Sequence, residues 1–294
     1  MIPTLIRREF WEHRNTFFPY VTVGLLVLVM LSVFAVGSAN VSIDDPGELT
    51  KLDVRFMQYG VDLFRDMSLE DRRSVMGMAY GFIAIVFSFF LLFVVFFYLL
   101  DCLYRDKKDR SILFWKSLPV SDLQTVGVKL FTAIVCVPVV HFLFIAVTQL
   151  IFLLAASVAA LGYDVPVWST LWKPSTVVFD QWADIGFHYV LVLLWQLPFY
   201  CWIVFVSSFA RSVPFIWAVG VPLAIVIIES MFGEETISIW IKHHIAPQLG
   251  GMNLTGSIVE IADRIASVDF FITLILSGLM LHGAVWFRGK AAEM

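Results

Sequence analysis

Long apolar runs constrain the fold of this 294-residue chain more than any other feature of its sequence. A run of about 20 apolar residues is long enough for an α-helix to cross a hydrocarbon core about 30 Å thick. The composition agrees, since 60% of the residues are hydrophobic and only 15% carry a charge. The sequence therefore predicts an all-α, polytopic helical membrane protein with a single transmembrane domain over residues 1–294.

Six transmembrane helices are predicted, each bounded by charged residues or by Pro and Gly. They cover residues 19–39, 75–100, 130–160, 185–209, 214–232 and 269–287. The third is longer than one crossing requires and contains Pro138, so we expect a tilt, a kink or an interfacial first turn. External loops are predicted at residues 40–74, 161–184 and 233–268. The first has the potential for one amphipathic helix, and a short re-entrant helix is an option for the last.

Orientation is predicted from the positions of Lys and Arg, because cytoplasmic loops retain them. The 20 cations divide into 12 on one side and 8 on the other, and the second side is rich in Asp and Glu. The side with 12 cations holds residues 1–18, 101–129, 210–213 and 288–294. We therefore expect both termini and the 101–122 loop in the cytoplasm, with the chain integral to a bacterial inner (plasma) membrane.

Residues 1–18 are predicted to form an interfacial helix on the inner leaflet, because Ile2, Leu5 and Phe10 fall toward one side at helical spacing. Glu9 and His13 interrupt this apolar stripe. Arg7-Arg8-Glu9-Phe10 superficially resembles a twin-arginine export signal. The apolar run that follows is too long for a typical signal peptide, and five more spans come after it, so we expect an uncleaved first span.

Residues 101–122, DCLYRDKKDRSILFWKSLPVSD, form a short charged segment between two long apolar runs. We predict a helix over Asp106–Ser117, a turn marked by Pro119, and a new helix that starts at a capping box, Ser121 to Gln124. Four consecutive large apolar residues, Ile112 to Trp115, are unusual in a water-facing connector. They either pack against the span ends and lipid headgroups or dock on a cytosolic partner.

In this order, the Arg7-Arg8-Glu9-Phe10 helix, the charged run Tyr104 to Arg110, and Ser117-Leu118-Pro119-Val120-Ser121 resemble the membrane subunits of ABC-2-type ATP-binding-cassette exporters. In that family, a charged run with a Leu-Pro-Val-Ser-like ending forms a coupling helix that contacts the ATP-hydrolysing subunit. The family's usual Gly-Thr pair is here Arg110-Ser111. The resemblance covers the whole chain in span count and loop order, and about 30 residues in specific motifs.

The resemblance implies a dimer of transmembrane subunits with two cytosolic ATP-binding subunits, which would supply ATP and Mg²⁺ as cofactors. The substrate class would be a lipid, a peptide or a hydrophobic small molecule. A secondary transporter or channel that works without ATP remains an alternative, as does a non-transporting membrane scaffold or assembly factor. The resemblance places the partner contact at Arg105, Asp106, Asp109, Arg110, Trp115, Lys116, Leu118 and Pro119.

Motifs for chemistry on this chain itself are lacking in the sequence. Gly283 to Lys290 has the wrong spacing for a P-loop, and neither GxSxG nor HExxH occurs. The sequence therefore predicts no catalytic residue and no enzyme, with ATPase activity only in the partner. The three cysteines lack the spacing of a metal site, and His243-His244 has no evident third ligand, so no metal site is predicted. The net charge of −4 gives no basic face for binding nucleic acid.

Polar residues inside a membrane are energetically costly, which makes them candidates for function. Glu229, His141, Gln149 and Gln196 are the candidate pathway or gate residues; Glu229 near a membrane interface is equally compatible with contact to water. The other three are alternatively interhelical hydrogen-bonding residues. Gly77 and Gly81 form a GxxxG pattern, which would allow a close approach of two helices.

Overall fold

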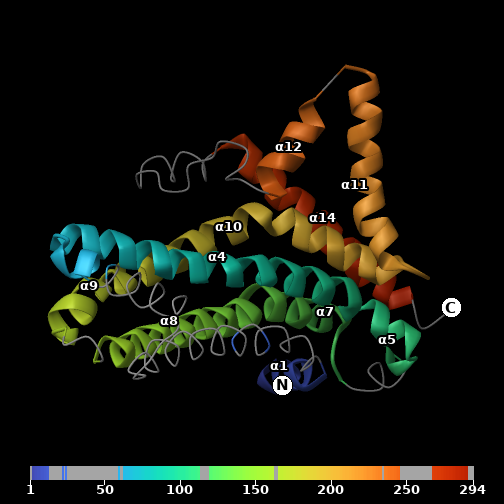
Figure 1. Ribbon diagram of the computed structural model, residues 1–294. Coiled ribbons are helices and arrows are strands. Elements are labelled where there is room, and N and C mark those ends of the chain that lie inside the picture. Colours follow the sequence, from blue (N-terminus) through green and yellow to red (C-terminus); the bar gives the residue numbers. More distant parts are fainter. Residues whose placement is uncertain are drawn as a thin grey trace, which may run out of the picture. The chain divides into compact units, whose positions relative to one another are not determined.

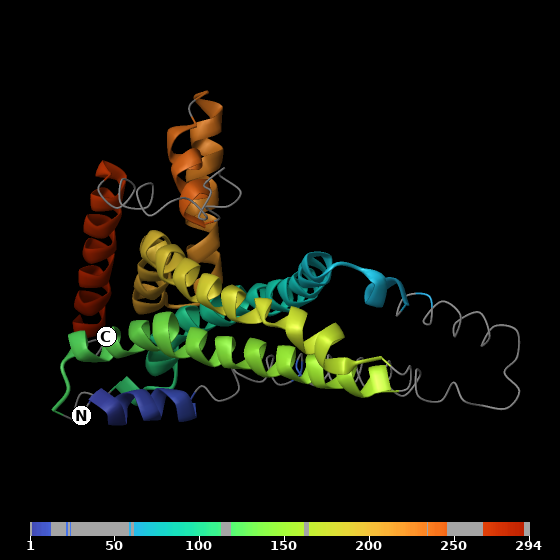
Figure 2. The same ribbon diagram turned by 90° about the vertical axis from the view of Figure 1, so that its left-hand side faces the viewer.

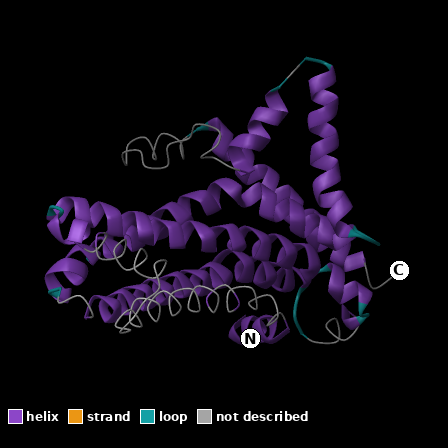
Figure 3. Ribbon diagram, in the orientation of Figure 1, coloured by secondary structure: helices purple, strands orange, loops and turns teal. Residues whose placement is uncertain are grey.

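The computed structural model of the chain describes residues 2–12, 62–112, 119–161, 165–233, 235–245 and 267–290, together with residues 22, 24 and 59. Within these ranges the chain is helical almost throughout and contains no strand (Figure 3). The predicted all-α class is therefore confirmed for this part of the chain. The first predicted span, 19–39, lies outside the described residues except at Thr22 and Gly24, which are helical.

Five helices in the described ranges are long and apolar enough to cross a membrane. They are Leu69–Lys108, Asp122–Val158, Val192–Phe209, Pro214–Met231 and Val268–Lys290. Each coincides with one of the predicted spans from the second to the sixth. The sequence-based expectation of a polytopic membrane protein is thus supported by five separate helices.

Figure 1 labels most of the helices that the structure describes. Their bounds are α1 (Ile2–Glu12), α4 (Leu69–Cys102), α5 (Tyr104–Lys108), α7 (Asp122–Phe131), the π-helical η2 (Thr132–Cys136), α8 (Val137–Leu161), η3 (Trp168–Trp172), α9 (Lys173–Ser175), α10 (Val177–Phe209), α11 (Pro214–Met231), α12 (Thr236–Ile245) and α14 (Val268–Lys290).

Several helices extend beyond the apolar runs from which they were predicted. α4 begins at Leu69, inside the predicted loop 40–74, because the hydroxyl of Ser68 accepts the backbone N–H of Asp71 and caps the first turn. The predicted loop 161–184 is largely helical, since it contains η3, α9 and the start of α10. A boundary predicted from hydropathy lies where the residues become polar. In these helices that point is inside the helix, and the helix itself continues further.

The third predicted span contains a π-helical turn, η2, immediately before Pro138. Proline has no N–H to donate to the carbonyl four residues earlier, which belongs to Ile134. The hydroxyl of Tyr189 on α10 donates to that carbonyl oxygen at 3.0 Å. The irregularity that Pro138 predicted therefore takes the form of a π-helical turn, with an outside donor for the carbonyl.

The chain divides into two compact units. Unit 1 contains Met1–Thr16, Leu92–Pro138 and Gly186–Met294, and unit 2 contains Phe17–Leu91 and Val139–Ile185. In unit 1, α1 and α14 both pack against α7 (Figure 2), and α11 pairs with α12.

The predicted GxxxG contact is confirmed in unit 2, where α4 packs on the start of α10. A Cβ atom added at Gly77 would meet Val177 at 3.8 Å, and one added at Gly81 would meet Gln181 at 3.6 Å. The side-chain amide of Gln181 donates to the carbonyl of Gly77 at 2.8 Å. Both distances are ordinary van der Waals contacts, so the two helices meet here without requiring glycine at either position.

Candidate functional site

The short helix α5 is fixed to the end of α10 at both of its termini. The hydroxyl of Ser207 accepts the backbone N–H groups of Leu103 at 3.1 Å and Tyr104 at 3.0 Å, which satisfies open donors at the start of α5. Lys107 donates to the carbonyls of Ser208 at 2.7 Å and Ala210 at 2.9 Å. A cation at these carbonyls also complements the negative end of the α10 dipole.

Asp106, in the middle of α5, lies in a largely buried cluster of charged side chains that we call the charged junction. Its members are Glu9, Asp106, Asp122, Lys129 and Arg288. Asp106 Oδ2 accepts from Arg288 Nη1 at 2.9 Å, and its Oδ1 lies 3.6 Å from Lys129 Nζ. The two carboxylate oxygens of one residue thus face cations on two different helices, α14 and α7.

Two further ion pairs complete the charged junction. Lys129 Nζ lies 3.1 Å from Glu9 Oε1 on α1, and Arg288 Nε lies 3.2 Å from Asp122 Oδ1 at the start of α7. A continuous series of ion pairs therefore joins α1, α7, α5 and α14, all within unit 1.

Burial makes these pairs energetically important. The side chains of Glu9 and Lys129 are 0% exposed, and those of Arg288 and Asp106 are 3% and 8% exposed. Charges removed from water are stable only when paired and hydrogen-bonded. Tyr98 donates to Glu9 Oε2 at 3.2 Å, and Arg8 lies 2.8 Å from Glu9 Oε1. The buried carboxylate of Glu9 therefore has three partners, Tyr98, Arg8 and Lys129.

The predicted capping box places Asp122 and is confirmed. Ser121 Oγ accepts the backbone N–H of Gln124, and the Gln124 side chain accepts the backbone N–H of Ser121, both at 3.1 Å. Asp122 then occupies the first turn of α7, where the helix dipole favours an anion.

The predicted helix over Asp106–Ser117 is wrong in its first half. α5 ends at Lys108, and Arg110 adopts a left-handed backbone with φ of +55° before the helix resumes at Ser111. A non-glycine residue in that conformation interrupts a helix. Ile112 is buried, which agrees with packing inside the protein, whereas the other three apolar residues, Leu113 to Trp115, lie outside the described residues.

The predicted partner-contact residues divide into three groups. Arg105 and Asp109 are about half exposed and lie 3.6 Å apart, and Arg110 and Pro119 are also exposed. Asp106 is buried in the charged junction, so it cannot be a surface contact. Trp115, Lys116 and Leu118 lie outside the described residues.

Glu229, the first of the candidate gate residues, caps a helix. Its carboxylate accepts the backbone N–H groups of Ile237 and Ser238, the latter at 2.7 Å, in the first turn of α12. The side chain is buried, and the anion lies at the positive end of the α12 dipole. Glu229 therefore joins the end of α11 to the start of α12.

Gln149 is an interhelical hydrogen-bonding residue. It is almost fully buried, donates to the Tyr80 carbonyl at 3.1 Å and accepts from Trp182 Nε1 at 2.6 Å. It thus links α8 to α4 and α10 in unit 2. In the same unit His141 is buried on α8, and in unit 1 Gln196 accepts from Tyr200 within α10 at 2.8 Å.

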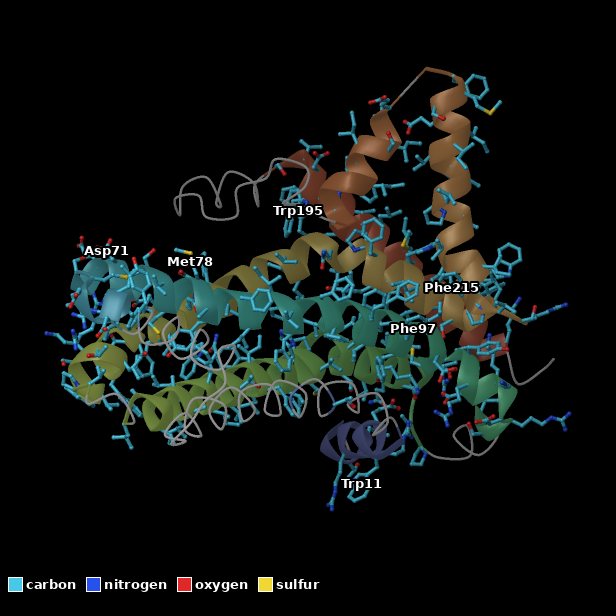
Figure 4. The ribbon with its side chains drawn as sticks, viewed as in Figure 1. Trp11, Asp71, Met78, Phe97, Trp195 and Phe215 are labelled. Atoms are coloured by element: carbon cyan, nitrogen blue, oxygen red, sulfur yellow. The ribbon has the colours of Figure 1, made fainter. Side chains whose placement is uncertain are left out.

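His244 is used in packing between α10, α12 and α14. One ring nitrogen lies 2.8 Å from the Trp240 carbonyl and the other 2.9 Å from Thr273 Oγ1. Its ring stacks on Trp195 with centroids 5.1 Å apart, and Figure 4 labels Trp195 on α10 beside α12. Both nitrogens therefore have partners in the protein.

Sequence reasoning missed four members of the charged junction as functional candidates: Glu9, Asp122, Lys129 and Arg288. Glu9 was noticed only as an interruption of the apolar stripe on α1, which is the signal that could have identified it. On this helix Trp11 projects outward and is 65% exposed (Figure 4), while Glu9 faces the protein. Lys129 and Arg288 were treated as markers of orientation.

The charged junction holds parts of four helices together, because each of its ion pairs joins atoms of two different helices. Within the described ranges, no group of three or more His, Cys, Asp or Glu side chains is arranged to hold a metal ion. Comparison with protein-family models, curated proteins and solved structures finds no match to this chain.

Proposed function

We propose that this chain is the membrane-spanning permease subunit of an ATP-binding-cassette exporter. A separate cytosolic subunit would hydrolyse ATP, and two copies of each would form the working assembly. The substrate would be a lipid, a peptide or a hydrophobic small molecule, which moves between the two membrane subunits.

One observation carries this proposal: α5 has an exposed charged face and a buried anchor. Arg105, Asp109 and Arg110 are exposed around its end, while Asp106 faces the charged junction and Lys107 binds the end of α10. A partner that pushes on the exposed face would act on an element that is already bonded to three longer helices, α7, α10 and α14. Five helices with the composition of membrane spans and the sequence resemblance support the same proposal.

The test is reconstitution of the full chain in lipid nanodiscs with the ATP-binding subunit that copurifies from its native membranes. Arg110→Glu reverses an exposed charge at the end of α5, and we expect it to reduce both partner binding and stimulation of the partner's ATPase. Arg65→Glu is the matched control, because Arg65 is likewise exposed but belongs to unit 2. We expect the control to behave as wild type.

Other outcomes would replace the proposal with one of its alternatives. Substrate movement by the purified chain without ATP would indicate a secondary transporter or channel. A bound partner whose ATPase is not stimulated by the wild-type chain would indicate a scaffold.

A further inference from the structure

We propose that Asp106 is the transmission residue of this chain, the side chain through which a displacement of α5 is passed to α7 and α14. This inference rests on the proposed function and assigns a role inside it. Asp106 is a positioning residue in this proposal, because its burial keeps it from any surface contact with a partner.

The geometry around Asp106 supports this role. Its Oδ2 is bonded to Arg288 on α14 at 2.9 Å and its Oδ1 faces Lys129 on α7 at 3.6 Å. Apolar packing is non-directional and lets helices slide past each other. A buried ion pair has a defined partner atom, and separating it leaves an uncompensated charge away from water. α5 therefore cannot move independently of these cations at low energetic cost.

The remaining pairs extend the connection in two directions. Through Lys129 the series continues to Glu9 on α1, and through Arg288 it returns to Asp122 at the start of α7. A contiguous network of ion pairs can carry energetic coupling between distant sites. The charged junction is such a network, and it connects the five-residue helix α5 to the C-terminal end of α14.

Two substitutions separate transmission from folding. Asp106→Asn removes the shared anion and leaves Lys129 and Arg288 short of a partner. The double variant Asp106→Asn with Arg288→Gln removes the unpaired cation as well, while Glu9 and Lys129 keep their pair, so this variant is expected to fold even if the single variant does not. Asp269→Asn makes the same change at an exposed carboxylate of α14, within unit 1 but outside the charged junction and the partner face, and is the matched control.

The readout is the distance between spin labels on two exposed residues of unit 1, Leu223 on α11 and Leu279 on α14. Labelled chains are diluted with unlabelled ones, so that each signal comes from one molecule. Cys136 is replaced by Ser, while the buried Cys102 and Cys201 stay unlabelled. The distance is measured with the partner bound, without nucleotide and with ATP plus vanadate.

We expect wild type and Asp269→Asn to show a nucleotide-driven distance change. In the double variant we expect partner binding at the wild-type level and a coupling reduced about fivefold or more. A double variant that binds the partner and moves as wild type would overturn the transmission role alone. A wild-type chain that binds no ATP-hydrolysing subunit would overturn both proposals.

Discussion

The guanidinium of Arg288, near the end of α14, donates to the carboxylate of Asp106 on α5 across 2.9 Å, although 182 residues separate the two in sequence. Both side chains are buried, and each has a second oppositely charged neighbour. This pair connects the last described helix of the chain to the short helix between two predicted spans.

Breaking the Asp106–Arg288 pair from one side is expected to cost much more than removing both partners. Asp106→Asn or Arg288→Gln alone should lower the free energy of unfolding by about 3–5 kcal/mol, because a buried charge is left uncompensated. The double variant should lose clearly less than the sum of the two. Denaturant titration of the purified chain in nanodiscs measures all three, and additive losses would show that the two residues are not coupled.

Glu229 is expected to stabilise α12 as a helix cap. Glu229→Ala should cost about 0.5–2 kcal/mol and speed hydrogen exchange at Ile237 and Ser238, since their N–H groups lose the carboxylate. Glu235→Ala is a suitable control, because Glu235 is exposed and accepts from Ser238 through its backbone carbonyl. Equal exchange rates in both variants would contradict the capping role.

Gln149 and Trp182 are expected to be coupled across unit 2. A double-mutant cycle with Gln149→Leu and Trp182→Phe should give an interaction of about 0.6–1.7 kcal/mol, the range for hydrogen bonds between membrane helices. Thermal unfolding in nanodiscs, followed for the four proteins of the cycle, measures it. A coupling energy of zero would show that the 2.6 Å contact does not stabilise the fold.

Two glycines of α14 are expected to respond in opposite directions to the same substitution. A Cβ atom at Gly283 would lie 2.7 Å from the ring of Phe205, which is itself held by Phe209 and Phe287. Gly283→Ala should therefore destabilise by about 1–3 kcal/mol. A Cβ atom at Gly278 would have nothing within 4 Å, so Gly278→Ala should raise the free energy of unfolding by up to about 1 kcal/mol. The melting temperatures of the two variants measure this difference. A shift in the same direction for both variants would contradict the packing described here.

Local sequence signals predicted local structure well. The apolar runs predicted the five described spans, and Ser121 with Gln124 predicted the cap of α7, because both depend on residues close together in the chain. The GxxxG pattern predicted a close helix contact but could not name Val177 and Gln181 as the partners. Helix ends were less well predicted, as the break at Arg110 shows, since a single backbone torsion decides them.

The charged junction depended on information that no local pattern carries. Glu9, Lys129 and Arg288 each occur among residues that favour a surface or an interface, so hydropathy alone classed them as solvated charges or orientation markers. Their burial is a consequence of α1, α5, α7 and α14 meeting at one place in unit 1.

The sequence by itself determined that this chain forms apolar helices of membrane-spanning length, with a charged segment between two of them. Helix formation and membrane burial follow from the composition of each run, which is a short-range property. Only the tertiary structure decided that Asp106 faces inward while Arg105 and Asp109 face outward. The physical reason is that the Asp106 carboxylate is stabilised away from water by cations on two other helices, and the positions of those cations are set by packing across the whole unit.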